Sequence, residues 1–274
     1  LYATLIARLF RKKIILDIGD LEIDSSVFKG EKKVKHSFLK TIVRNFVKST
    51  WDKADIIITN NAGIQKDIQS EIQCNDKVKY LPFLVDLDKF KKLDVPKENQ
   101  IVFPGIIAIN IYLQGIVKAM PKVLKHFPDL KLQIYGGGER ETEVKNLIKK
   151  LSLENSCFVN NPVPREKIPM ILSKSILGLI ALVDTKAMSH TTPNKTFEYF
   201  ACSLPVFAYG PSDALEKILN ESKAGYHVRG NDPDKIADGL IQILSDKQLL
   251  EEYSKNGRNY LENAVDYSKL AELM

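Results

Sequence analysis

Cysteine and long apolar runs are both scarce in this 274-residue chain, and each scarcity excludes a class of protein. The three cysteines, Cys74, Cys157 and Cys202, are far apart and odd in number, which argues against a disulfide framework or a zinc site. No apolar run is long enough to span a bilayer as a helix. The basic residues 11–13 follow the first apolar stretch, the reverse of a signal peptide. We therefore expect a cytoplasmic protein.

Histidine is equally sparse, and its positions give no support for a metal centre. The four histidines, His36, His126, His190 and His227, have no ligand spacing. No Ser-His-Asp or Cys-His arrangement can be argued from the order of the residues. We therefore predict no metal–histidine site, and no residue pattern here indicates a resident cofactor.

Positive charge is in moderate excess, and part of it forms a stripe. Forty Lys and Arg against 34 Asp and Glu suit an acidic lipid surface or an anionic substrate, and no nucleic-acid-binding motif is present. Lys40, Arg44 and Lys48 recur at four-residue steps on a predicted amphipathic helix. This stripe fits peripheral contact with an anionic membrane, although the pattern by itself favours an ordinary surface helix with its apolar face in the core. Trp51 fits an interface or the core.

The order of the elements predicts an α/β fold. Short apolar runs without alternation are separated by helical patterns, which is typical of parallel sheets covered on both faces. A polar segment at residues 92–99 divides two such series. We predict two doubly wound, Rossmann-like domains facing a cleft, the first of them incomplete. Their predicted bounds are residues 1–95 and 96–250, with C-terminal helices at 251–274 that cross back to the first domain.

The most informative stretch reads PNKTFEYF and begins at Pro193. Pro193 suits the first turn of a helix. Asn194, Lys195 and Thr196 then stand where unpaired backbone N–H groups and the helix dipole favour an anion such as a phosphate. Glu198, one turn further, is placed to meet a ribose hydroxyl attached to that phosphate. A well-capped core helix without a ligand explains the same residues.

Two glycine turns are predicted at the same edge of the sheet. Gly105 ends the strand at residues 100–104, and the glycines 136–138 follow the next strand and open a helix. The backbone of such turns can approach a phosphate closely. Glu141 stands where the third glycine of the dinucleotide fingerprint would be, so the turn is not that fingerprint. We expect both turns and the Pro193 stretch to converge on one site.

Together these motifs resemble retaining glycosyltransferases of family 4, the group 1 transferases, which have the two-lobed GT-B architecture. The resemblance covers nearly the whole chain. Its strongest motifs are PGIIAINIYLQGIVKAM at 104–120, LKLQIYGGGERE at 130–141, FVNNPVPREKIPMIL at 158–172 and PNKTFEYFACSLPVFA at 193–208. The PNK-x-FEY element is typical of a branch whose members build bacterial capsules, O-antigens and exopolysaccharides.

The resemblance implies that the second lobe binds a nucleotide-sugar donor, UDP- or GDP-linked. Glu198 matches the glutamate that holds the ribose, Gly105 matches the turn under the diphosphate, and residues 161–163 match the segment that frames the base. The other implied donor-binding residues are Gln114, Gly137, Gly138, Asn161, Val163, His190, Thr192, Pro193, Asn194, Lys195 and Thr196. The implied reaction retains configuration and needs no metal, with the leaving diphosphate stabilised by helix-end amides and a cation.

The donor lobe departs from the family pattern at three positions. His190 stands where the first glutamate of the paired motif is expected. The basic residues of the first donor loop are replaced by Ile107 and Gln114. Lys195 is then the clear cation near the leaving group, and we predict that it has taken over their role.

The front lobe departs further. Gly19 stands where many relatives carry His or Arg, so we predict that Asp20 or backbone groups serve there. The glycine-rich loop expected near the N-terminus is absent, and the chain begins without Met inside a helical pattern. We expect an N-terminally truncated fragment, which is inactive alone.

The leading hypothesis is a glycosyltransferase that moves a sugar from the donor to a lipid-linked or polysaccharide acceptor, at the inner face of the plasma membrane. One alternative is a sugar-nucleotide epimerase of the same fold, which would alter its donor without an acceptor. The other is a catalytically weak nucleotide-sugar-binding partner protein, which would bind the donor without turnover.

Overall fold

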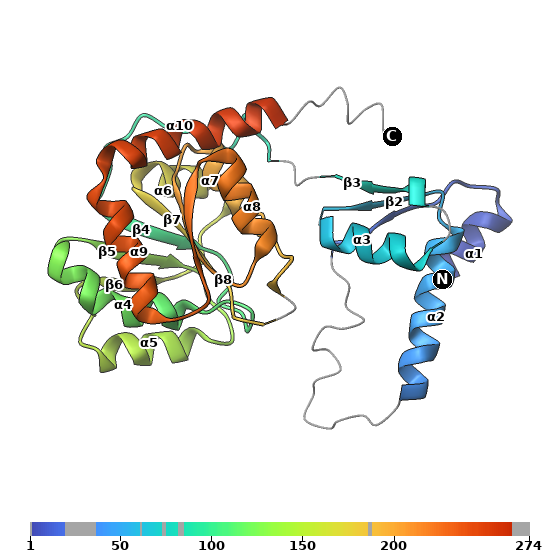
Figure 1. The fold of residues 1–274 in the computed structure, drawn as a ribbon, viewed down its shortest axis with the longest axis horizontal. Coiled ribbons are helices and arrows are strands. Elements are labelled where there is room, and N and C mark those ends of the chain that lie inside the picture. The colour runs from blue at the N-terminus through green and yellow to red at the C-terminus, as the bar shows by residue number, and fades with distance from the viewer. Residues whose placement is uncertain are drawn as a thin grey trace. The chain divides into compact units, whose positions relative to one another are not determined.

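The computed structural model describes residues 2–19, 37–60, 62–72, 75–81, 85–185 and 188–264 (Figure 1). The chain divides into two compact units, Leu1–Phe83 and Leu84–Met274. The division falls before the polar segment at residues 92–99, so residues 85–95 group with the second unit and not with the first. How residues 251–274 run relative to the first unit stays a prediction.

The first unit is built on a small parallel sheet. Its strands are β1 (Ile15–Asp17), β2 (Ile56–Thr59) and β3 (Val78–Tyr80), hydrogen-bonded in that order. Its helices are α1 (Tyr2–Leu9), α2 (Ser37–Lys53), α3 (Ala62–Glu71) and the 3₁₀ turn η2 (Asn75–Lys77). Trp51 is 6% exposed and lies in a core cluster with Ile57 and Ile68. Its burial decides between the two sequence interpretations in favour of the core.

The basic stripe of α2 is partly engaged within the protein. Arg44 Nε donates to Glu71 Oε2 of α3 at 3.3 Å, and a second guanidinium nitrogen also contacts this carboxylate. This hydrogen bond is the main cause that lowers the pKa of Glu71, and the charge of Lys48 adds to it. The side chain of Lys40 lies outside the described residues. Among the described helices, none has the length and apolarity needed to cross a membrane.

The second unit contains a six-stranded parallel sheet. Its strands are β4 (Gln100–Pro104), β5 (Lys131–Tyr135), β6 (Cys157–Asn160), β7 (Leu177–Ala181), β8 (Val206–Gly210) and β9 (Gly225–Arg229). They lie in the order β6-β5-β4-β7-β8-β9. Strands β4, β7 and β8 are buried along their whole length, which explains their continuous apolar sequences. The order switches direction between β4 and β7, and ligands of open α/β sheets bind at such a switch point.

Helices flank this sheet (Figure 1). They are α4 (Leu113–His126), α5 (Glu141–Lys150), the 3₁₀ turn η3 (Arg165–Lys167), α6 (Ile168–Lys174), α7 (Lys195–Ala201), α8 (Asp213–Ser222), α9 (Pro233–Ser245) and α10 (Lys247–Ala264). Helix α4 packs against α5 and α9, and α10 packs against α7, α8 and α9. The 3₁₀ turn η3 leads directly into α6, which has Pro169 in its first turn.

Helix α7 lies directly on β7 because residue 178 has no side chain. A Cβ atom at Gly178 would lie 2.6 Å from Cδ2 of Tyr199 in α7. The Tyr199 ring is fully buried, and its hydroxyl donates to Leu179 O at 3.0 Å. The close packing of α7 on the sheet therefore depends on this glycine.

Replacing Gly178 by alanine tests this packing. We expect Gly178→Ala to lower the free energy of unfolding by about 1–3 kcal/mol, because the buried ring must shift. Urea titration followed by circular dichroism measures the change. Gly137→Ala is the matched control, since its Cβ would meet only side-chain ends, the Glu141 carboxylate at 3.1 Å and Pro162 Cγ in ordinary contact at 3.8 Å. Equal losses in the two variants would contradict the close contact.

Candidate functional site

Two glycine turns meet at the carboxyl edge of the second sheet, beside the switch point. Gly105 follows β4 with a φ of +147°, a conformation that favours glycine. Its N–H donates to Tyr135 O at 2.9 Å, and Ile107 N donates to Gly137 O at 2.9 Å. A Cβ atom at Gly136 would lie 1.9 Å from Gly105 O. Glycine is therefore required for the backbones to approach this closely.

Lys195 brings a third loop to the same place. Its Nζ lies 3.6 Å from the centre of the Phe103 ring in β4, and a Cβ at Gly105 would lie 2.8 Å from it. Among the described residues, no hydrogen-bond acceptor or carboxylate is paired with this Nζ. Burial lowers the pKa of Lys195 to about 7, and the charge of Glu198 partly opposes this shift. Lys195 is half-buried. An ammonium that has lost part of its water and has no counter-ion is destabilised, and an anion bound here would relieve that cost.

Glu198 lies one turn further along α7 and is held by an arginine. Its side chain is 12% exposed, and its Oε1 accepts a hydrogen bond from Arg165 Nη2 at 2.7 Å. The guanidinium carbon of Arg165 lies 5.0 Å from the centre of the Phe90 ring. No role was predicted for Arg165, Phe90 or Phe103, although Arg165 lies inside the motif at 158–172 and Phe103 directly precedes the motif at 104–120.

The start of α7 differs from the prediction. The helix begins at Lys195 and not at Pro193, and it has only seven residues. The backbone N–H groups of Thr196 and Phe197 donate to the carbonyls of Pro193 and Asn194, at 3.0 Å each. These turn-like bonds take up N–H groups that the prediction left open for an anion. The positive charge of Lys195 is therefore the main attraction for an anion at this point.

The other predicted donor-site residues lie around this edge with different degrees of exposure. Gln114 is 7% exposed; its Nε2 donates to Glu143 Oε2 at 2.9 Å, and its buried Oε1 has no partner among the described residues. A Cβ at Gly137 would lie 3.8 Å from Pro162 Cγ, so the glycine turn adjoins the predicted base-framing segment. In that segment Asn161 is exposed and Val163 half-buried.

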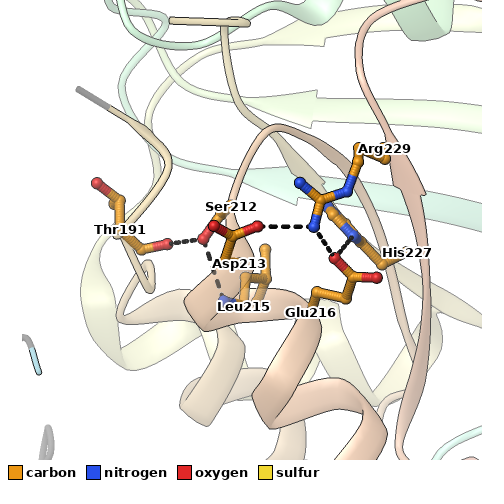
Figure 2. A network of polar contacts seen from close by, with 7 residues as sticks. All are labelled: Thr191, Ser212, Asp213, Leu215, Glu216, His227 and Arg229. Atoms are coloured by element: carbon orange, nitrogen blue, oxygen red, sulfur yellow. Dashed lines mark hydrogen bonds and ion pairs between the residues drawn. The ribbon is translucent and has the colours of Figure 1, made fainter. Parts of the chain in front are cut away.

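The loop before α7 is anchored to the start of α8 (Figure 2). Ser212 Oγ donates to Thr191 O at 2.7 Å, and Asp213 N donates to Ser189 O at 2.8 Å. His190 is exposed between these two anchors. The anchors fix the course of the loop that leads to Lys195 and leave the His190 side chain open to solvent.

The first turn of α8 is itself held by ion pairs with Arg229. Arg229 Nη2 donates to Asp213 Oδ1 at 2.6 Å and also to Glu216 (Figure 2). The His227 side chain is 4% exposed, and its Nδ1 lies 3.8 Å from Glu216 Oε2, beyond hydrogen-bond distance. Burial is the main cause that lowers the pKa of His227. This cluster was not predicted from the sequence, although Ser212 before Asp213 is a standard helix-start signal.

Of the two predicted positions in the front lobe, the structure describes one. Asp20 lies outside the described residues, so its role in the front lobe stays a prediction. Gly19 is described, and a Cβ there would meet only Asn60, at 3.7 Å. Across the described part of the chain, no three His, Cys, Asp or Glu side chains gather in a group that could hold a metal ion.

Comparison with known proteins gives one family and a consistent fold. A family model described as glycosyl transferases group 1 matches residues 85–260. The chain is 25% identical to an uncharacterised glycosyltransferase of Methanocaldococcus jannaschii, over 85% of this chain and 65% of that protein. It is also 25% identical to a poly(glycerol-phosphate) alpha-glucosyltransferase of Bacillus subtilis, over 62% of this chain and 26% of that protein. The chain thus spans less than two thirds of the length of these two relatives.

A third relative is covered more fully. The chain is 25% identical to the N-acetylgalactosamine-N,N'-diacetylbacillosaminyl-diphospho-undecaprenol 4-alpha-N-acetylgalactosaminyltransferase of Campylobacter jejuni, over 98% of this chain and 71% of that protein. Among solved structures, Anabaena HepE in complex with UDP and glucose matches 98% of this chain and 73% of its own, with a TM-score of 0.77 and 13% identity. At that identity the likeness shows the fold alone. The predicted α/β fold with Rossmann-like domains of the GT-B class is confirmed.

The environment of Lys195 predicts a pH-dependent stability. The lysine has its ordinary pKa of 10.5 in the unfolded chain and a pKa of about 7 in the folded protein. Between these values the unfolded state binds more protons, so the free energy of unfolding rises with pH relative to Lys195→Met, which has no group to titrate. Below about pH 7 both states are protonated and the difference becomes constant. Urea titrations of both proteins across this range measure it, and a difference independent of pH would contradict the lowered pKa of Lys195.

Proposed function

The chain belongs to the glycosyl transferases group 1 family, and from this premise we propose that its second unit binds a nucleotide-sugar donor. The whole protein then transfers the sugar to a glycan or lipid-linked acceptor in cell-surface polysaccharide biosynthesis. The observation that carries this proposal is the Lys195 ammonium, which has no anionic partner among the described residues and lies beside the Gly105 turn. A diphosphate provides the missing anion at the switch point of the sheet.

Each part of the donor has a place in this proposal. The diphosphate lies over Gly105, and Lys195 stabilises the negative charge that develops as the sugar leaves. Glu198 accepts hydrogen bonds from the ribose hydroxyls, and the base lies against the glycine turn at 137–138 and residues 161–163. The remaining predicted residues, Gln114, His190, Thr192, Pro193, Asn194 and Thr196, line the diphosphate and sugar end of the site.

The reaction class is supported by what the relatives' names describe. Two of the named relatives form alpha linkages, which supports transfer with retention from an alpha-linked donor, and no metal ion is required in this scheme. The diphospho-undecaprenol in the Campylobacter jejuni name supports a lipid-linked acceptor, and the UDP and glucose in the Anabaena structure support a UDP-linked sugar. We place the chain in family 4, in the PNK-x-FEY branch. The names describe transfer, and none of them favours an epimerase or an inactive partner.

Contact with the inner face of the plasma membrane is a second part of the proposal. The stripe of Lys40, Arg44 and Lys48 on α2 provides positive charge for anionic lipid. The Glu71 carboxylate neutralises part of the Arg44 charge, so the stripe attracts lipid less than the sequence suggested.

Nucleotide binding tests the donor site. We expect UDP or GDP to bind the protein, and Lys195→Ala to weaken that binding about 10- to 100-fold, because a charge-assisted hydrogen bond contributes about 1.5–3 kcal/mol. Binding of the corresponding nucleoside, which has no phosphate, is expected to change little. Isothermal titration calorimetry measures both affinities.

Lys174→Ala is the control, since this lysine pairs with Glu98 on the surface, at the amino edge of the sheet. If Lys195→Ala binds the diphosphate within about twofold of the wild type, the role of Lys195 is wrong. If the wild type binds neither UDP nor GDP, the proposed function itself is wrong.

A further inference from the structure

The Arg165–Glu198 ion pair joins a largely exposed side chain to a largely buried one. The Arg165 side chain is 71% exposed and that of Glu198 12% exposed, and Nη2 lies 2.7 Å from Oε1. Ion pairs with so exposed a member contribute little to stability. We therefore expect this ion pair to affect the orientation of the Glu198 carboxylate more than the stability of the fold.

Arg165 is itself held in place by Phe90. Its guanidinium lies over the Phe90 ring, with 5.0 Å from the guanidinium carbon to the ring centre, a distance that allows a cation–π attraction. Phe90 is 4% exposed, so the ring is a fixed support. Arg165 thus spans from a rigid ring to the Glu198 carboxylate, and its side chain has lost much of the freedom that exposed arginines have.

The same phenylalanine is tied to the far end of α7. Arg258 Nη1 donates to Phe90 O at 3.4 Å and to Ala201 O at 3.1 Å. Ala201 is the last residue of α7. Helix α7 is therefore connected to Phe90 at its carbonyl end through Arg258 and at Glu198 through Arg165. These two links fix both the helix and the direction of the Glu198 side chain.

One oxygen of Glu198 remains open. Arg165 uses Oε1, and among the described residues Oε2 has no hydrogen-bond partner. Glu198 lies three residues after Lys195 in α7, so both side chains leave the same face of the helix. A carboxylate with one oxygen fixed by an arginine presents its other oxygen in a defined direction for a hydroxyl donor.

We propose that Arg165 is a positioning residue for ribose recognition, which orders the Glu198 carboxylate before the nucleotide arrives and does not itself contact the nucleotide. This inference rests on the proposed donor site. If it is right, Arg165 affects the affinity only for nucleotides that carry ribose hydroxyls, because Glu198 accepts hydrogen bonds from these hydroxyls. Loss of Arg165 then leaves Glu198 free to rotate, and an ordering cost is added to each ribose hydrogen bond.

The test compares nucleotides with and without the ribose hydroxyls. The probes are UDP and GDP and their 2′,3′-dideoxy counterparts, titrated by calorimetry into wild type, Arg165→Gln and Arg165→Lys. We expect the wild type to prefer the ribose form about tenfold or more. In Arg165→Gln this preference is expected to fall at least about threefold, while affinity for the dideoxy form stays within about twofold. Arg165→Lys is expected to recover part of the preference, because lysine keeps the charge.

A control variant and three possible results separate this inference from other roles of Arg165. Lys174→Gln removes a cation from another exposed ion pair and is expected to leave the preference unchanged. Equal weakening of both nucleotide forms would mean that Arg165 contacts the nucleotide directly, and stronger ribose binding would mean that the ion pair blocks the site. Either result, or an unchanged preference, overturns the inference. Absence of nucleotide binding in the wild type would overturn the proposed function, and this inference with it.

Discussion

A half-buried lysine ammonium without a counter-ion among the described residues is the interaction on which the functional edge of the second unit depends. The face of the Phe103 ring, 3.6 Å from Nζ, partly offsets the loss of water around this charge. The ring belongs to β4 and the lysine to α7, so this contact joins the strand on one side of the switch point to the helix that follows the strand on the other side. The Gly105 turn can lie beside the Lys195 amine because glycine has no side chain. A Cβ atom at this position would lie 2.8 Å from Nζ.

Two separate sets of contacts hold this edge. The first fixes α7: the ring of Tyr199 lies against Gly178, and Arg258 binds the last carbonyl of the helix. The second fixes the preceding loop through Ser212 and the ion pairs of Arg229 at the start of α8. Neither set uses Lys195 Nζ or Glu198 Oε2, so both atoms stay unpaired among the described residues. A preorganised site of this kind stabilises charge without having to rearrange.

Local sequence features predicted most of the fold. The apolar runs, the glycine turns and the order of strands and helices give two parallel sheets, because strand and turn preferences are properties of short segments. The predicted start of α7 was wrong. Pro193 suited the first turn of a helix, but α7 begins only at Lys195. Trp51 could not be assigned from sequence, because burial depends on what packs around it.

The site was predicted only as far as single positions allow. Gly105, Lys195 and Glu198 each stood in a recognisable motif. The contacts between them and their partners could not be predicted, because Arg165 and Glu198 are 33 residues apart in the chain and Phe103 is further still from Lys195. Such pairs are set by the topology of the sheet, which brings the ends of β4, β6 and β7 to one edge. The periodicity of the sequence does not show which strand ends lie next to one another.

The most direct measurement of the central claim is the number of protons taken up when a nucleoside diphosphate binds. Calorimetric titration of UDP or GDP near pH 7, in buffers of different ionisation enthalpy, gives this number. Burial lowers the pKa of Lys195 to about 7, so about half of the free protein carries a neutral amine there, and a bound diphosphate restores the charge. The wild type should take up about half a proton more than Lys195→Arg, which stays charged throughout. Equal uptake by the two proteins would contradict the claim that Lys195 receives the diphosphate.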